Sequence, residues 1–259
     1  MTNIVLYRYS FIAMSDFKMK NRRVGRLNMT EKEKRNKIVK EVIKPLIKSA
    51  GYKCSGTTFY RECHECYVII YLQSSQFNNE ESGFSFWFNI GVLDKKEVVD
   101  INDVKRSYGG NSPTREDTFL PDNGLLNPYR SNGYSIGGMK NGQRIVTDYD
   151  DAATRISNDI SQYILSRLDL VQNLEDWDRL MEDLYELNNN KRNHLLSFFY
   201  GASMLACSLS NKKFLVGFID DGRITKQEVL ENMDLLQEVL KYTSNNGDDV
   251  EAFVMYVLQ

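Results

Sequence analysis

Residues 83–92, GFSFWFNIGV, alternate between apolar and polar side chains, which is the pattern of a β-strand with one buried face. Apolar residues occupy every second position from Phe84 to Val92, and Ser85, Trp87 and Asn89 stand between them. One face of this strand is therefore strongly apolar and needs a cover. Two earlier segments, 57–62 (TTFYRE) and 66–75 (CYVIIYLQSS), are also rich in β-branched and aromatic residues and predict two further strands.

A helix is expected before these strands. Thr30 and Glu33 have the spacing of a capping box, in which each side chain satisfies a free backbone amide of the other residue. Apolar residues recur at helical spacing over 38–47, and Gly51 stands where a helix commonly ends. Pro45 lacks an N–H and crowds the carbonyl four residues earlier, so we expect a kink or a break into two short helices near Lys44.

The helix is the nearest element that can cover the apolar strand face, which favours an α+β layer over alternating βαβ units. Residues 94–142 hold three of the four prolines and many Gly, Asn and Ser, and we interpret them as a long loop. A short strand is predicted within 143–149 (QRIVTDY), and helical periodicity follows it. Segments 174–187 and 195–210 predict an amphipathic helix and a buried helix.

The expected fold is thus α+β, with an N-terminal helix packed on a small, mostly antiparallel sheet and a helical C-terminal half. Three regions are predicted along the chain. Residues 1–28 are expected to be a flexible leader, residues 29–170 an α+β domain, and residues 171–259 a helical extension packed on the same domain.

The net charge of −2 hides an asymmetry between the two ends of the chain. Residues 1–53 carry 14 Lys or Arg against 4 Asp or Glu, so the remainder is strongly acidic. A basic segment can attract nucleic acid. These basic residues fall mostly on the polar face of the expected helix, however, so a solvated face is favoured and nucleic acid is not the expected partner.

Composition also limits the cellular setting. No segment reaches the roughly 18 to 20 apolar residues that span a bilayer, since the longest candidate, 195–210, is shorter and contains Gly and Ser. The first 28 residues have apolar before basic character, the reverse of a secretory signal. Four cysteines in 259 residues do not make a disulfide framework. We therefore expect a cytoplasmic protein that does not associate with membranes.

The tetrapeptide CHEC, 63–66, contains a CxxC pair, which can supply half of a zinc site. Cys54 and His64 could complete the ligand set on paper, but the adjoining strands favour a hairpin turn. No metal is expected, and whether Cys63 and Cys66 bind one stays open.

Signatures of common enzyme classes are missing: the sequence has no Walker loop, no GxSxG and no HExxH, and only two histidines. Residues 218–233 are similar to the second half of a calcium-binding loop, but Gly217 and Ile219 fall where the first oxygen ligands should stand. Thr225 and Glu228 instead predict a second capping box. We predict neither a catalytic group nor a cofactor.

Several segments quoted above resemble a bacterial family named domain of unknown function 4304. The resemblance spans about residues 31–93, and only weak similarity follows at 134–138 (YSIGG) and 175–177 (EDW). It implies a bacterial α+β fold and no particular activity. The residues that carry it are Pro45, Gly51, Tyr52, Phe59, Tyr60, Arg61, Gln73, Ser74, Asn89, Ile90 and Gly91.

The leading functional hypothesis is a non-enzymatic binding or protein-interaction protein of an immunity-like or regulatory kind, with a protein partner and an unknown oligomeric state. Two alternatives stay open. One is an enzyme with an Arg, Tyr and carboxylate site at the sheet face and the 94–142 loop, and the other is nucleic-acid binding through the basic N-terminal segment. The candidate binding residues are Arg106, Tyr108, Arg115, Tyr129 and Arg130.

Overall fold

The computed structural model of the chain describes residues 29–131, 133–140, 143–205, 209–243 and 246–259. The leader expected over 1–28, which is the first part of the basic N-terminal segment, and Cys207 therefore lie outside the described residues.

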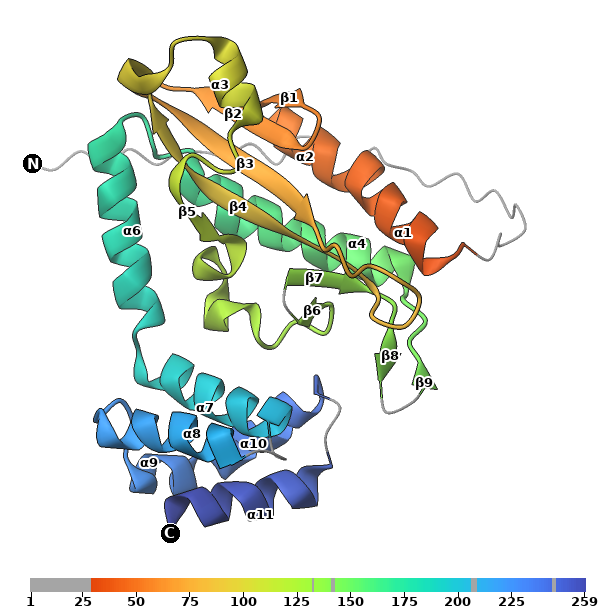
Figure 1. The fold of residues 1–259 in the computed structure, drawn as a ribbon, viewed down its shortest axis with the longest axis vertical. Coiled ribbons are helices and arrows are strands. Elements are labelled where there is room, and N and C mark those ends of the chain that lie inside the picture. Colours follow the sequence, from red (N-terminus) through yellow and green to blue (C-terminus); the bar gives the residue numbers. More distant parts are fainter. Residues whose placement is uncertain (1–28, 132, 141–142, 206–208, 244–245) are drawn as a thin grey trace, which may run out of the picture.

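An antiparallel sheet forms the centre of the N-terminal two thirds of the molecule (Figure 1). Its strands follow the order β1-β2-β3-β4-β7-β6, and β5 pairs with the same edge of β4 as β7 does. The strands are β1 Lys53–Ser55, β2 Thr58–Glu62, β3 Cys66–Ser74, β4 Phe84–Asp94, β5 Asn111–Arg115, β6 Arg130–Ser131 and β7 Gly133–Ile136. A separate two-stranded ribbon joins β8 (Met139–Lys140) to β9 (Gln143–Arg144).

Helices cover the sheet and make up the C-terminal half, so the predicted α+β class is confirmed. The first helical run comprises α1 (Glu31–Lys37), the π-helical segment η1 (Ile38–Ile43) and α2 (Lys44–Ser49). The second comprises α4 (Tyr149–Asn158), the π-helical segment η5 (Asp159–Leu165) and α5 (Ser166–Leu168). The remaining α-helices are α3 Ile101–Arg106, α6 Leu174–Asn188, α7 Lys191–Leu205, α8 Leu209–Asp220, α9 Lys226–Glu231, α10 Met233–Leu240 and α11 Gly247–Leu258.

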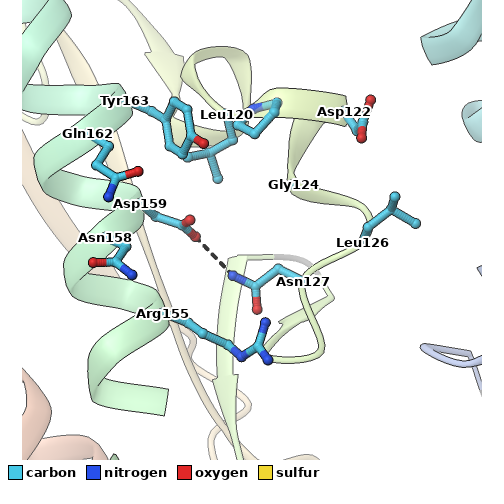
Figure 2. A pocket seen from close by; sticks show the side chains of 11 residues that line it. Leu120, Asp122, Gly124, Leu126, Asn127, Arg155, Asn158, Asp159, Gln162 and Tyr163 are labelled. Carbon is cyan, nitrogen blue, oxygen red and sulfur yellow. Dashed lines mark hydrogen bonds between the residues drawn. The ribbon is translucent and has the colours of Figure 1, made fainter. Parts of the chain in front are cut away.

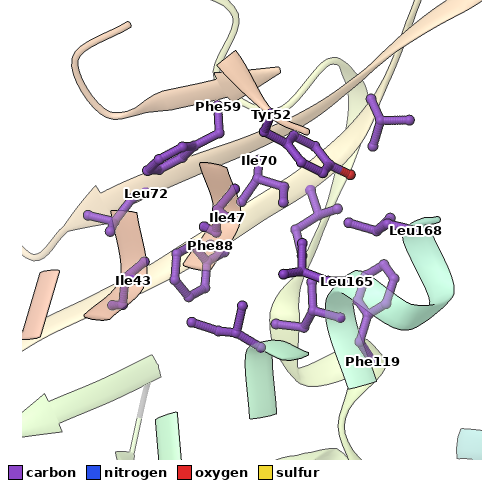
Figure 3. Packing of buried hydrophobic residues seen from close by; sticks show 14 of the residues in the cluster. Ile43, Ile47, Tyr52, Phe59, Ile70, Leu72, Phe88, Phe119, Leu165 and Leu168 are labelled. Carbon is purple, nitrogen blue, oxygen red and sulfur yellow. The ribbon is translucent and has the colours of Figure 1, made fainter. Parts of the chain in front are cut away.

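The apolar face of β4 is buried as the alternation predicts. Phe86, Phe88 and Ile90 are at most 1% exposed, and they join Ile43 and Ile160 of the two helical runs in one hydrophobic cluster (Figure 3). Each fully buried side chain of this size contributes about 1.5–3 kcal/mol relative to an exposed one. The opposite face of the sheet carries α3, whose Val104 packs on Tyr60 and Ile69.

Pro45 does not break the first helix, which corrects the expectation of a break into two short helices near Lys44. The run from Glu31 to Ser49 is continuous but changes its winding over η1, where the Lys44 amide donates to the Val39 carbonyl, five residues earlier. The wider turn directly before Pro45 replaces the α-helical spacing in which a proline ring collides with the carbonyl four residues back.

The interpretation of residues 94–142 as a loop is wrong in part. This segment contains α3 and four short strands, β5 to β8, the last of which pairs with β9 just beyond it. The long strand β4 offers an edge to two of them: Asn89 pairs with Arg115 of β5, and Phe86 pairs with Tyr134 of β7. Gly110 permits the entry to β5, because its φ is +84° and a Cβ there would lie 2.3 Å from the Val92 oxygen.

The helices after α6 have their own hydrophobic cluster. It includes Phe198 and Phe199 of α7, Leu215 of α8, Leu236 of α10 and Val254 of α11. The capping box predicted at Thr225 and Glu228 is present at the start of α9. In the part of the chain that the structure describes, no helix combines the length and the apolar character needed to cross a membrane.

Candidate functional site

A cleft of about 310 Å³ lies between the segment 120–127 and the helical run of α4 and η5 (Figure 2). The 3-10 segment η4 (Pro121–Gly124) forms one wall, and Arg155, Asp159 and Tyr163 project from the other. The full lining is Leu120, Pro121, Asp122, Gly124, Leu126, Asn127, Arg155, Asn158, Asp159, Gln162 and Tyr163. Polar and apolar groups thus share a cleft that lies against the main hydrophobic cluster.

Asp159 is the central charged group of the cleft. Its Oδ2 atom accepts hydrogen bonds from Asn127 Nδ2 at 2.9 Å and from the Tyr134 hydroxyl at 3.1 Å. Burial is the largest influence on this carboxyl and raises its pKa, while the Tyr134 hydrogen bond and the charge of Arg130 act in the opposite direction. Among the described residues none donates to Oδ1, and no cation lies within ion-pair distance of the carboxylate. Asp159 is therefore a partly desolvated negative charge with acceptor capacity left over.

The other charged groups of the cleft are already neutralised. Arg155 Nε donates to both carboxylate oxygens of Asp151, at 3.1 and 3.0 Å, and the Tyr129 hydroxyl donates to the same carboxylate at 2.8 Å. Asp122 accepts from Arg192 Nε at 3.2 Å. The latter contact joins the cleft wall to α7 of the C-terminal helices.

A buried ion pair is connected to the cleft through Tyr134. Glu116 is fully buried and accepts from Arg130 Nη1 at 3.0 Å and from the Phe88 amide at 2.8 Å. Burial raises the pKa of Glu116, and the charge of Arg130 opposes this shift. The Arg130 guanidinium also lies 4.7 Å from the centre of the Tyr134 ring. Because Tyr134 in turn holds Asp159, one chain of contacts connects β4, the 116–130 segment and η5.

The five candidate binding residues fall into three places. Tyr129 and Arg130 adjoin the cleft through Asp151 and Tyr134. Arg115 lies at the sheet, with its guanidinium 4.6 Å from the Trp87 ring and its Nε 3.9 Å from Glu116. Arg106 is exposed at the end of α3, and the Tyr108 ring packs edge-on against Tyr71 with centroids 5.0 Å apart. The structure therefore does not assemble the five residues into one surface.

Asp159, Asn127 and Arg155 were missed from the sequence. Asp159 carried one usable signal, because it lies three residues after Ile156 and immediately before Ile160, both of which are core positions of an amphipathic helix. This signal is weak, because carboxylates commonly flank the apolar stripe of an amphipathic helix. Asn127 carried no comparable signal, because only the fold brings it within hydrogen-bond distance of a residue 32 positions later.

No group of three or more His, Cys, Asp or Glu that could hold a metal ion occurs among the residues that the structure describes. The CHEC segment forms the predicted hairpin turn between β2 and β3, and the Cys63 amide donates to the Cys66 carbonyl at 2.9 Å. Hydrogen bonding from Cys66 lowers the pKa of Cys63 to about 7. The Cys63 thiol also contacts the Val171 carbonyl at 3.3 Å, so the turn anchors the connection between α5 and α6.

Comparison with known families adds one finding. A family model described as "Domain of unknown function (DUF4304)" matches residues 42–115, from within the first helical run to the end of β5. This confirms the resemblance seen in the sequence, over less than half of the chain. A search of the curated proteins and a search of the solved structures each gave no match.

Proposed function

We propose that this chain is a non-enzymatic binding protein whose cleft between η4 and η5 accepts a cationic side chain, Lys or Arg, of a partner protein. The observation that carries the proposal is the Asp159 carboxylate, which lines the cleft without an ion-pair partner among the described residues. A guanidinium or ammonium group entering the cleft would supply the missing charge, and such charge-assisted hydrogen bonds are stronger than neutral ones.

The size of the cleft also supports a side chain as occupant. Small-molecule sites commonly enclose roughly 300–1,000 Å³, and this cleft, at about 310 Å³, lies at the lower end of that range. The acidic character of the chain after residue 53 agrees with a basic partner, because complementary charge accelerates association and excludes competitors.

The lining favours binding over catalysis. Among the described lining residues there is no Ser, Cys or His that could act as a nucleophile or a near-neutral base, and Arg155 and Asp122 are held by their own partners. Glu116 has a raised pKa but is enclosed by Arg130 and the Phe88 amide below the cleft. An immunity-like or regulatory role in a bacterial cytoplasm is the setting that we propose for this binding activity.

The test compares matched charge removals. Tagged wild-type protein, Asp159→Asn and Asp183→Asn are used as baits in the native host, and co-purified proteins are quantified by mass spectrometry. Asp183 lies exposed on α6, outside the cleft, so its variant controls for the loss of one negative charge. We expect a stoichiometric partner with wild type and Asp183→Asn that is depleted at least tenfold with Asp159→Asn. Equal recovery with all three baits would contradict the proposal.

A further inference from the structure

A second hollow, separate from the cleft, lies on the open face of the sheet. It has a volume of about 420 Å³ and is bounded by β3, β4 and β7 on one side and by the 75–82 connection on the other. Gln73 and Trp87, which are paired across β3 and β4, line it together with Ser85 and Ser135, which are paired across β4 and β7. We call this hollow the open-face pocket.

The orientation of the Gln73 amide in this pocket is fixed by its neighbours. Its Oε1 atom accepts from Trp87 Nε1 at 3.0 Å and from Asn89 Nδ2 at 2.7 Å. The indole nitrogen can only donate, so the amide atom that faces it must be the oxygen. The Gln73 NH2 group consequently turns away from both partners, and none of the described residues accepts a hydrogen bond from it. Two donors are left for a ligand.

The remaining wall of the pocket is preorganised. Asn78 donates to the Ser85 carbonyl at 2.9 Å and accepts from the Ser85 amide at 2.6 Å, which fixes the 75–82 connection to the edge of β4. Phe77 of this connection is 70% exposed and lines the pocket, so its ring is accessible to a ligand. The Ser85 hydroxyl donates to Ser135 at 3.0 Å, so the Ser135 proton remains available to a ligand.

The chemistry of the lining identifies the class of ligand. Two aromatic rings, two Gln amides and several Ser hydroxyls line the pocket, and no charged residue is among its described lining residues. Two cations adjoin it and are engaged by the protein: the Arg115 guanidinium lies 4.6 Å from the centre of the Trp87 ring, and Arg35 donates to the Ser74 hydroxyl. A nucleotide or nucleic-acid strand would require cations against its phosphates. A sugar ring presents C–H groups on its faces, which pack on aromatic rings, and hydroxyls around its edge, which pair with amides and hydroxyls. We propose that the open-face pocket binds a neutral mono- or disaccharide, with Trp87 as platform and the Gln73 NH2 group as donor.

Sugar binding at this pocket would give a role to residues that do not line the cleft. Gln73, Ser74 and Asn89 belong to the segments through which the sequence resembles its family, yet none of them contacts the cleft. Here Gln73 and Ser74 line the pocket, and Asn89 fixes the Gln73 side chain.

The experiment titrates the intact chain with glucose, galactose, N-acetylglucosamine, cellobiose, lactose and N,N′-diacetylchitobiose, and follows tryptophan fluorescence and heat of binding. Trp87 lies in the pocket, and the only other tryptophan, Trp177, is in the main hydrophobic cluster. We expect a saturable response to at least one probe with a Kd in the micromolar to millimolar range. If none of the probes gives a response at concentrations up to about 10 mM, the proposal is overturned.

Gln73→Glu provides the specific variant. A carboxylate oxygen still accepts from Trp87 and Asn89, so the fold is retained, while both donors are lost. We expect sugar affinity to fall at least tenfold in this variant and to be unchanged in Gln237→Glu on α10 and in Asp159→Asn of the cleft. Wild-type affinity in Gln73→Glu would overturn the proposal. So would a Gln73-dependent response to oligouridylate that exceeds every sugar and weakens steeply with salt, because it would reassign the pocket to nucleic acid.

Discussion

At Asp159, stability and binding place opposite demands on one side chain. Burial raises the folded-state pKa above the ordinary value of 3.8, so the folded protein takes up this proton more readily than the unfolded chain. The stabilising contribution is therefore fully present below the unfolded pKa and is lost as pH rises through the folded pKa. We predict that the unfolding free energy of Asp159→Asn at neutral pH is at least as large as that of wild type. Any difference between the two proteins should vanish toward acid pH.

Urea unfolding of both proteins across this pH window checks the prediction. The Asn side chain keeps an oxygen for the bonds from Asn127 and Tyr134, so no donor is orphaned. A clear loss of stability in Asp159→Asn at neutral pH would show that the charge serves the fold, and the case for a binding role would weaken accordingly.

The ion pair of Glu116 and Arg130 behaves differently, because both partners are buried. Arg130→Met leaves the Glu116 carboxylate without its cation, and breaking such a pair costs about 3–5 kcal/mol. The loss should shrink in acid, where Glu116 is protonated. Arg155→Met removes a half-exposed i,i+4 pair with Asp151 and should cost less than about 1 kcal/mol. Similar losses for the two variants, measured by urea unfolding, would refute this ranking.

Some of the residues near the cleft could be predicted from the sequence. Tyr129 and Arg130 were selected as aromatic and arginine residues in a polar segment, and both adjoin the cleft. Arg106 and Tyr108 were selected by the same rule and lie elsewhere. Composition of a segment does not encode the pairing that brings Asn127 to Asp159, so the centre of the cleft could not be found in this way.

At the scale of elements, periodicity and capping were sufficient where the signal is local. The strands β2, β3 and β4 and both capping boxes follow directly from alternation and from Thr-to-Glu spacing. The strands within 111–144 have two to five residues each and depend on the edge of β4 or on one another for their hydrogen bonds. These strands form because they pair with strands elsewhere in the fold. Their own Gly- and Pro-rich sequence has no local pattern that predicts a strand.

The cap of α9 gives the prediction at this scale. Thr225 accepts from the Glu228 amide at 3.2 Å, and the Glu228 carboxylate accepts from the Thr225 amide at 2.7 Å. Thr225→Ala removes one half of this exchange and should lower the stability of the C-terminal helices by about 1 kcal/mol. Far-UV circular dichroism during urea unfolding measures it. Lys226→Ala, at the next position, leaves the cap intact, and an equal loss there would contradict the assignment to capping.

At the scale of the whole molecule, two hydrophobic clusters divide the chain. The first contains the sheet, the two covering helical runs and Trp177 of α6, and the second joins α7 to α11. We propose that they are two cooperative units. Both tryptophans belong to the first unit, since Trp87 is on β4 and Trp177 packs in the first cluster. Thr225→Ala should therefore shift the circular dichroism transition and leave the tryptophan fluorescence transition in place. Coincident shifts of both signals would show a single cooperative unit.

Pairing of a cationic partner group with Asp159 is tested by the affinity of the purified partner for the matched variants. Isothermal titration of that partner into wild-type protein, Asp159→Asn and Asp183→Asn should give a Kd at least tenfold weaker for Asp159→Asn alone, which corresponds to about 1.4 kcal/mol. The wild-type affinity should also fall in acid as Asp159 is protonated, with no such dependence in Asp159→Asn. Equal affinities for all three proteins would contradict the claim.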